Sequence, residues 1–421
     1  MRRLHSLLAI ALLLFAGAQQ QRSYVDWYEQ MVAAFREGDH ATMAEAASGA
    51  LRLRPRFPPM LVNLALAHAL MGDSERALDL LHGVAEMDLA YPIAEGEQFA
   101  SLAASPRFQE IVARMSDSSL PLGDADVAFT LARKDFFPEG LAVDGTTGDF
   151  FVGSVRFGDI VRIDATGDPQ AFAGLPWSVL GMKVDGQRGL LWVAISGMEQ
   201  TADLEEEKLG RAGVAALALT DGSLRGEYLL PRGSGDRVVG DLVVAADGSV
   251  FASDSIGGGV WVLRPGTDEV TELLPDGTLE SPQGLDLADD GALYVAAYSG
   301  GIYRVDTASR EVQWLEGPEE VTTYGIDGLY FDGADLIAVQ NGISPHRVVR
   351  LHLDRAGATV TGAQVLLRAD PRFGEPTLGA VVGDDFYLVA NSPWAEFADP
   401  SQLPDASSLP VPTILRLPLS R

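Results

Sequence analysis

The chain has 421 residues, of which 47% are hydrophobic, so it is long enough to bury at least one large core. Its 59 acidic and 31 basic residues give a formal net charge of −28, which argues against a nucleic-acid partner and against anionic membrane surfaces. The sequence contains no cysteine, which excludes disulfides and thiolate metal sites.

The first 18 residues have the pattern of a signal peptide. Arg2 and Arg3 form the charged start, SLLAIALLLF the apolar segment, and Ala16-Gly17-Ala18 a small-residue cleavage site. The apolar segment is short for a membrane span, although an uncleaved anchor is the alternative. An exported protein without disulfides fits the bacterial periplasm, so we expect a periplasmic or secreted protein with no membrane span after cleavage.

Residues 22–117 have the helix–turn–helix pattern and the 34-residue period of tetratricopeptide repeats. A third helical piece, SPRFQEIVARM, would cap the stack. The pattern predicts a small α-helical domain with a possible groove for a protein partner, and a plain helical bundle without a binding role is the alternative. The first copy is marked by Trp27, Gly38, Ala50 and Pro55, and the second by Leu61, Leu64, Ala65, Gly72 and Ala77.

From residue 126 to residue 421 the pattern changes to strands that recur as a repeated phrase. Each phrase is a strand, a tight Asp/Gly turn and a second apolar strand, followed in most copies by a third strand. Six copies about 40–50 residues apart predict a mainly β protein with a six-bladed β-propeller, in preference to a β-sandwich. The copies are PEGLAVDGTTGDFFVGS, VLGMKVDGQRGLLWVAIS, GDLVVAADGSVFASDS, PQGLDLADDGALYVAAY, IDGLYFDGADLIAVQN and TLGAVVGDDFYLVANS.

An unclosed propeller would expose a sheet edge, so one further strand is needed to complete the ring. The segment VAFTLAR, residues 127–133, is placed to supply it by pairing with the strand that contains Thr413–Leu417. The longest loops follow the second strands of blades two, five and six, on the face where each blade's first strand begins. Long loops on one side of a rigid scaffold mark that face as the functional one.

Polar residues precede the first strand in four of the six copies. Blade one has Glu139, blade three the Gly240-Asp241 pair, blade four Gln283 and blade five Asp327, whereas leucines stand at blades two and six. Carboxylates brought together at a channel mouth repel one another unless a hard cation lies between them. The pattern therefore predicts a divalent-cation site, with Ca²⁺ as the expected ion, unless these are ordinary turn residues.

On these motifs the propeller resembles the SMP-30/gluconolactonase/LRE-like family, relatives of regucalcin. The resemblance implies one divalent cation held by a Glu of blade one, Asn residues of blades three and four and an Asp of blade five, with the Asp as the base in lactone hydrolysis. Here Glu139 of PEG and Asp327 of IDG match this pattern. Gln283 stands for one Asn, and Asp241 stands one position away from the other.

The other residue types narrow the chemistry further. There is no G-x-S-x-G nucleophile motif, and only His346 and His352 lie in the propeller, so a histidine-dyad lactonase has little support. We expect Asp327 to act as catalytic base toward a water polarised by the ion. Substrate contacts are predicted from Trp177, Tyr324, Trp394 and His346, unless the aromatic residues pack the rim and the histidine is solvated.

Two functions are compatible with the sequence. One is a metal-dependent hydrolase of a lactone or related ester, a small-molecule substrate. The other is a non-catalytic propeller that binds a small ligand or a protein partner. The departures from the family pattern at blades three and four keep the second function open.

Overall fold

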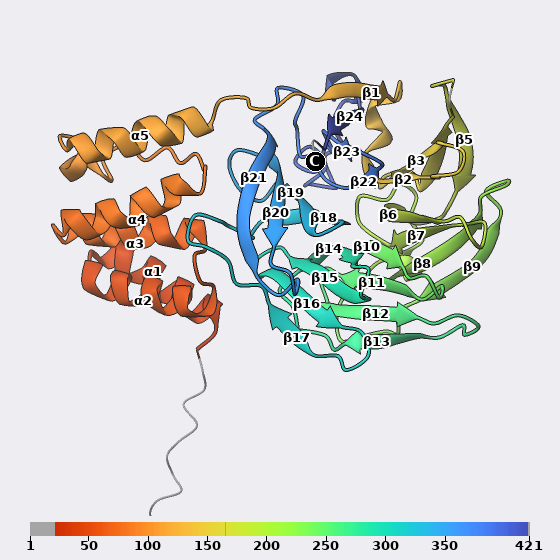
Figure 1. Cartoon of the computed structure of the whole chain (residues 1–421), viewed down its shortest axis with the longest axis horizontal. Coiled ribbons are helices and arrows are strands. Elements are labelled where there is room, and N and C mark those ends of the chain that lie inside the picture. The colour runs from red at the N-terminus through yellow and green to blue at the C-terminus, as the bar shows by residue number, and fades with distance from the viewer. Residues whose placement is uncertain (1–21, 165, 420–421) are drawn as a thin grey trace, which may run out of the picture. The chain divides into compact units, whose positions relative to one another are not determined.

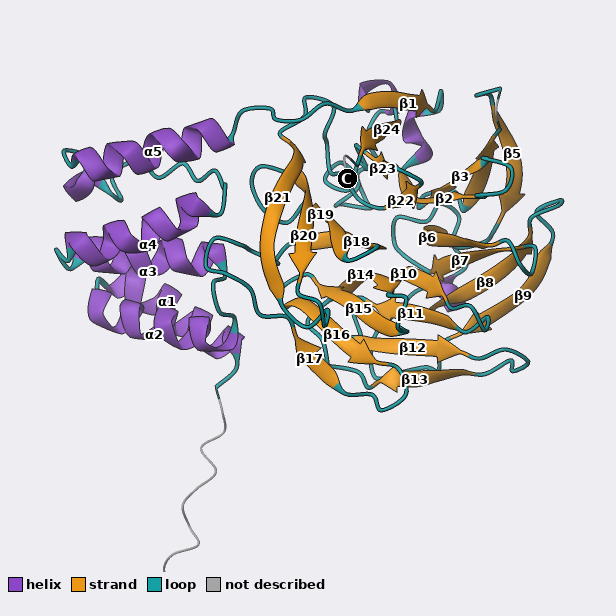
Figure 2. Cartoon of the chain, viewed as in Figure 1, coloured by secondary structure: helices purple, strands orange, loops and turns teal. Residues whose placement is uncertain are grey.

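The computed structural model describes residues 22–164 and 166–419, so the predicted signal peptide lies outside the described residues. These residues form two compact units, one of residues 22–82 and 93–109 and one of residues 83–92 and 110–419. Figure 2 shows the helices in the N-terminal part and the strands in the remainder. None of the described helices is long and apolar enough to cross a membrane.

The N-terminal part consists of α-helices, and the ends of the first helix are marked by capping residues. Ser23 and Asp26 cap the first helix reciprocally, and Gly38 ends it in the left-handed conformation. Trp27 packs on Gly49 so closely that a Cβ there would lie 2.4 Å from the indole. The assignment to tetratricopeptide repeats stays a prediction. The helices are α1 (Tyr24–Glu37), α2 (His40–Leu53), α3 (Pro58–Leu70), α4 (Ser74–Glu86) and α5 (Pro106–Ser118).

The strands of the described chain form six four-stranded antiparallel sheets, which confirms the predicted six-bladed propeller. The first three blades are β2 (Pro138–Val143), β3 (Phe150–Ser154), β4 (Asp159–Ile163) and β5 (Pro169–Gly174); β6 (Ser178–Asp185), β7 (Leu190–Ser196), β8 (Ala212–Ala218) and β9 (Leu224–Leu229); and β10 (Val239–Val244), β11 (Val250–Asp254), β12 (Gly259–Leu263) and β13 (Val270–Leu274).

The second half of the ring continues the same order. Its blades are β14 (Pro282–Leu287), β15 (Ala292–Ala297), β16 (Gly301–Asp306) and β17 (Val312–Trp314); β18 (Ile326–Asp332), β19 (Asp335–Gln340), β20 (Arg347–Leu353) and β21 (Val360–Arg368); and β22 (Gly379–Val382), β23 (Asp385–Val389) and β24 (Thr413–Pro418) with β1 (Asp126–Thr130). Figure 1 shows the first strands β2, β6, β10, β14, β18 and β22 in a ring around the centre.

The ring is closed by a strand from each end of the propeller sequence. β1 pairs antiparallel with β24, with Thr130 opposite Thr413 and Asp126 opposite Arg416. The edge of β24 is thereby covered, as predicted for the segment VAFTLAR. Phe129 of this strand lies edge to face with Phe150 of blade one, with ring centroids 5.2 Å apart, so β1 also joins the sixth blade to the first.

The hydrophobic core lies in layers between neighbouring blades. Phe151 of blade one packs with Val179 and Val193 of blade two, and Tyr330 of blade five packs with Phe386 of blade six. Each layer buries the apolar faces of two sheets, so every blade supports the next around the ring. The first strands are therefore held firmly at the centre, where their N-terminal ends carry the polar residues singled out from the sequence.

Candidate functional site

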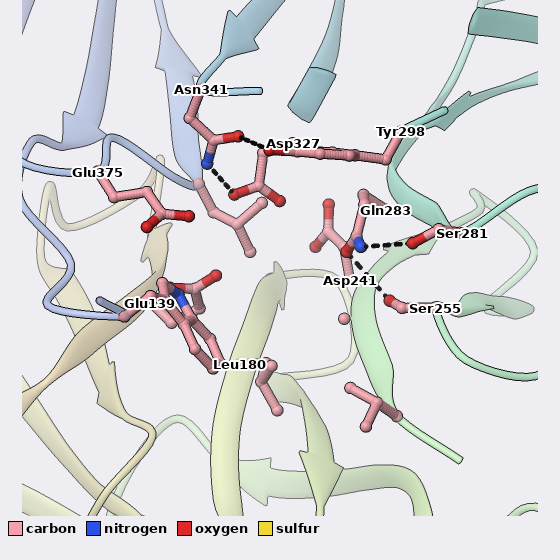
Figure 3. Close-up of a pocket in the computed structure, with 14 residues that line it drawn as sticks. Glu139, Leu180, Asp241, Ser255, Ser281, Gln283, Tyr298, Asp327, Asn341 and Glu375 are labelled. Atoms are coloured by element: carbon pink, nitrogen blue, oxygen red, sulfur yellow. Dashed lines mark hydrogen bonds between the residues drawn. The ribbon is translucent and has the colours of Figure 1, made fainter. Parts of the chain in front are cut away.

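A pocket of about 310 Å³ opens where the first strands begin, and all four predicted ligands line it. Glu139 comes from β2, Asp241 from β10, Gln283 from β14 and Asp327 from β18. Figure 3 shows these side chains pointing toward one another across the pocket. Leu180 and Leu378, the predicted leucines of blades two and six, complete the ring.

Glu139 is almost fully buried, with 5% of its surface exposed. The indole Nε1 of Trp394 and the hydroxyl of Ser392 both donate to its Oε2, at 2.8 and 3.0 Å. Burial, followed by repulsion from Asp327, raises the pKa of the Glu139 carboxyl well above its ordinary value. The two hydrogen bonds therefore fix this carboxyl in position, and the neighbouring groups determine whether it is ionised.

Asp327 is fixed by a short chain of hydrogen bonds. Asn341 Nδ2 donates to Asp327 Oδ2 at 2.8 Å and to the carbonyl of Pro376 at 3.0 Å, and its own Oδ1 accepts from the Tyr298 hydroxyl at 3.0 Å. Burial raises the pKa of Asp327 to about 7, although the hydrogen bond from Asn341 lowers it. Asp327 is thus poised to exchange a proton near neutral pH.

Strand register gives the position of Asp241 in blade three. Val239 pairs with Asp254 as Pro282 pairs with Ala297, so Gly240 occupies the position that Gln283 has in blade four. Asp241 therefore stands where the five other blades have glycine. Its carboxylate fits because a Cβ on Gly181 of blade two would lie only 2.2 Å from its Oδ1. Asp241 reaches the pocket from one position deeper in the strand than the other predicted ligands.

Asp241 is 3% exposed and incompletely paired. Its Oδ1 accepts from the Leu242 amide at 2.8 Å, whereas its buried Oδ2 has no hydrogen-bond partner of good geometry. Burial raises the pKa of Asp241 to about 7 against the attraction of Lys183. A buried carboxylate oxygen without a well-formed hydrogen bond is costly to ionise, which agrees with the raised pKa.

Gln283 is held by two hydroxyl groups. Its Oε1 accepts from Ser255 at 3.0 Å, and its Nε2 donates to Ser281 at 3.2 Å. Ser255, Tyr298 and Asn341 share one origin that sequence reasoning missed, because each directly follows the second strand of its blade. In an antiparallel blade, the end of the second strand lies beside the start of the first. The same register argument would have found them.

Glu375 is a further pocket carboxylate that the sequence pattern did not reveal. It lies in the loop between β21 and β22, and Figure 3 shows it pointing into the pocket beside Asp327 and Glu139. Burial and the neighbouring Glu396 raise the pKa of Glu375. Its place in an irregular loop gave no periodic signal.

The predicted substrate contacts are met only in part. Trp394 lines the pocket, but Trp177, Tyr324 and His346 do not. Trp177 is buried in the layer between blades one and two and donates to Glu227 at 2.9 Å, and Tyr324 is equally buried. His346 Nδ1 lies 2.8 Å from the carbonyl of Gly374. These aromatic rings follow the rule that large apolar side chains fill the core.

The sequence matches no protein-family model and no curated protein. Solved structures similar to the chain are an aldose sugar dehydrogenase from Streptomyces coelicolor (16% identity, TM-score 0.47, 71% of this chain and 99% of that one), a gluconolactonase from Xanthomonas campestris (18%, 0.48, 72% and 93%) and a luciferin-regenerating enzyme (14%, 0.48, 70% and 95%). At these values the similarity says nothing of this chain's activity. The propeller is established by the pairing of its own strands.

Proposed function

We propose that the protein hydrolyses a lactone or related ester in the central pocket, with a divalent cation, Ca²⁺ by preference, as cofactor. The observation that carries the proposal is the pair Glu139 and Asp327, a buried and a part-buried carboxyl group that face one pocket, where the charge of Asp327 raises the pKa of Glu139. The predicted export to the periplasm belongs to the proposal as well.

The donor set fits a hard cation. Hydrogen bonds to Glu139 end on Oε2 and the one to Asp327 ends on Oδ2, so Oε1 and Oδ1 keep lone pairs for a ligand. Gln283 Oε1 and Asp241 Oδ2 add two more oxygens. Among the described residues no three His, Cys, Asp or Glu side chains form a metal-binding group. The amide oxygen and water would therefore complete the coordination.

The chain's own residues supply the proton chemistry. Asp327, with its pKa of about 7, would accept a proton from a water molecule that attacks the substrate carbonyl, and the ester oxygen would leave with a proton as the acyl bond breaks. Asn341 holds Asp327 in place, and Trp394 with Ser392 holds Glu139. When bound, the cation would polarise the carbonyl and stabilise both carboxylates in their charged forms.

The alternative is a propeller that binds a small ligand or a protein partner without catalysis. It draws support from Gly240, which brings no donor atom to the position where Gln283 stands in blade four. A weaker ligand set would suit a binding site whose ion, if any, only neutralises charge.

The first test compares two substitutions in the site. Asp327→Asn keeps an oxygen ligand but removes the base, so hydrolysis should fall by about 100-fold or more while calcium binding weakens only modestly. Glu139 has no role in proton transfer in this proposal. The loss of activity in Glu139→Gln should therefore follow its loss of calcium affinity and be partly rescued by excess calcium. The measurements are metal analysis and initial rates on a panel of lactones and esters, with and without chelator.

The matched control is Glu311→Gln, because Glu311 is exposed in the turn before β17, on the face opposite the pocket. It should leave rates and calcium binding unchanged. Equal and calcium-rescuable losses in the two site variants, together with a wild type that hydrolyses no member of the panel, would instead establish the binding propeller.

A further inference from the structure

The pocket is strongly acidic and has no basic residue in its lining. Of the residues that line it, Glu139, Asp241, Asp327 and Glu375 are acidic, and none is lysine, arginine or histidine. Lys183 attracts Asp241 but does not line the pocket; its Nζ lies 5.1 Å from the centroid of the Tyr330 ring. A divalent cation would offset two of the four negative charges, and Lys183 a third.

Glu375 is the carboxylate left over in this balance. Its carbonyl accepts a backbone hydrogen bond from Ser392 at 2.9 Å, but in the described structure its side chain has no hydrogen bond or ion pair. It is half-buried and close enough to Asp327 and Glu139 to repel both. Glu396, on the loop after β23, adds a second negative charge near it. A partly desolvated carboxylate without a partner is stabilised by a cationic ligand.

A second carboxylate of the lining also favours a positively charged ligand when no metal ion is bound. The Oδ2 of Asp241 is buried and has no hydrogen-bond partner of good geometry, so a positive charge in the pocket would stabilise this group as well. The apolar part of the lining comes from Leu180, Val238, Leu378 and Trp394, and its neutral polar part from Ser255, Ser281, Gln283, Tyr298 and Asn341. Acceptor groups beside an apolar and aromatic wall suit an alkylammonium group, whose carbon atoms are apolar and whose charge is diffuse.

We infer that Glu375 determines specificity by selecting ligands that carry an ammonium group and by rejecting those that carry a carboxylate or phosphate. The binding preference does not depend on the proposed hydrolase function, whereas its consequence for the reaction rests on that function. It has a consequence for turnover, because hydrolysis of an ester produces a carboxylate. The acidic pocket would repel that product and favour its release.

The experiment uses two probes of the same shape, choline with its trimethylammonium group and the neutral 3,3-dimethylbutan-1-ol. Their affinities for the full-length protein are measured by calorimetry, with excess calcium and again with chelator. Choline should bind at least about 10-fold more tightly under both conditions, since one charge pair in a partly buried site is worth at least that much. Equal affinities, or no detectable choline binding, overturn the inference on wild-type protein alone.

The variant Glu375→Gln should abolish the preference for choline, whereas Glu311→Gln should keep it. A preference unchanged in Glu375→Gln would show that another group provides selectivity and would overturn the role of Glu375. The acetate esters of the two alcohols separate this inference from the proposed function. Glu375-dependent choline binding without hydrolysis of either ester would refute the hydrolase alone, and equal hydrolysis of both would refute the selectivity alone.

Discussion

Three carboxyl groups at the centre of the propeller bind protons more tightly in the folded chain than in the unfolded one. Burial raises the pKa of Asp241 and of Asp327 to about 7, and that of Glu139 well above its ordinary value. The folded state therefore holds protons that the unfolded state has already released above about pH 4. Ionising these groups costs the fold stability, unless a cation compensates.

This sign leads to a prediction for stability against pH. In chelator, the free energy of unfolding should fall as pH rises from about 4 to about 7, by on the order of 1 kcal/mol per pH unit for each group, and the contributions of Asp241 and Asp327 should level off above pH 7. Calcium should reduce the fall, and Asp327→Asn should make it shallower. Thermal melts from pH 5 to 8 measure it, and stability that rises with pH in chelator would contradict the raised pKa values.

At this scale the structure brings the four predicted ligands to one pocket, where they stay predicted ligands, whereas Trp177 and Tyr324 lie outside it. Glu139 and Asp327 were recognisable because each stands directly before a glycine at the start of a repeated strand. Trp177 and Tyr324 were misplaced because an aromatic residue near a strand end looks the same in sequence whether it packs the core or lines a pocket. Only the packing between blades distinguishes the two.

At the scale of elements, glycines set how closely the first strands approach. A Cβ added to Gly284 of β14 would lie 2.4 Å from both the Asp327 carbonyl oxygen and the Leu329 amide nitrogen of β18. Both atoms belong to the backbone and cannot swing aside. The repeated glycine was visible in the sequence as a marker of five of the six blades, and this contact is its physical reason in blade four.

Gly284→Ala should therefore push β18 away from β14 and displace Asp327. We expect a loss of about 1–3 kcal/mol in unfolding free energy, as for other overpacked sites, together with weaker calcium binding. Gly145→Ala is the control, because Gly145 lies in the turn after β2 and a Cβ there meets nothing within 4 Å. Denaturant unfolding with calcium titration measures both, and equal stability of the two variants would argue against this packing.

The long loop of blade six was predicted from its length to lie on the functional face, but its contacts were not predicted. Between β23 and β24 it turns back over the pocket, and Phe397 packs on Phe137 with ring centroids 4.9 Å apart. This packing brings Trp394 to Glu139. A long irregular loop has no period, so its contacts could not be predicted, although its length could.

At the scale of the whole molecule, stability depends on closing the ring. Phe129→Pro would remove a β1 amide at the point where it pairs with Ile414 of β24. A proline within a paired strand removes a ladder hydrogen bond, and here it would also expose the edge of β24. We expect a large drop in melting temperature and the formation of oligomers, measured by thermal melts and size-exclusion chromatography.

Phe129→Leu is the control at the same position, because it keeps the amide and most of the apolar contact with Phe150. It should melt only slightly below wild type and stay monodisperse to the same degree. A Phe129→Pro variant as stable as Phe129→Leu would show that the ring holds together without its closing strand.

Ring closure also has a consequence in time. The pocket takes residues from all six blades, so its parts are spread along the chain from Glu139 to Trp394. The strand that locks them together, β24, comes later still, at Thr413–Pro418. A chain emerging from a ribosome or a translocation pore would hold every acidic side chain of the site and yet bind nothing. Ligand recognition would begin only when the whole propeller has been synthesised and has folded.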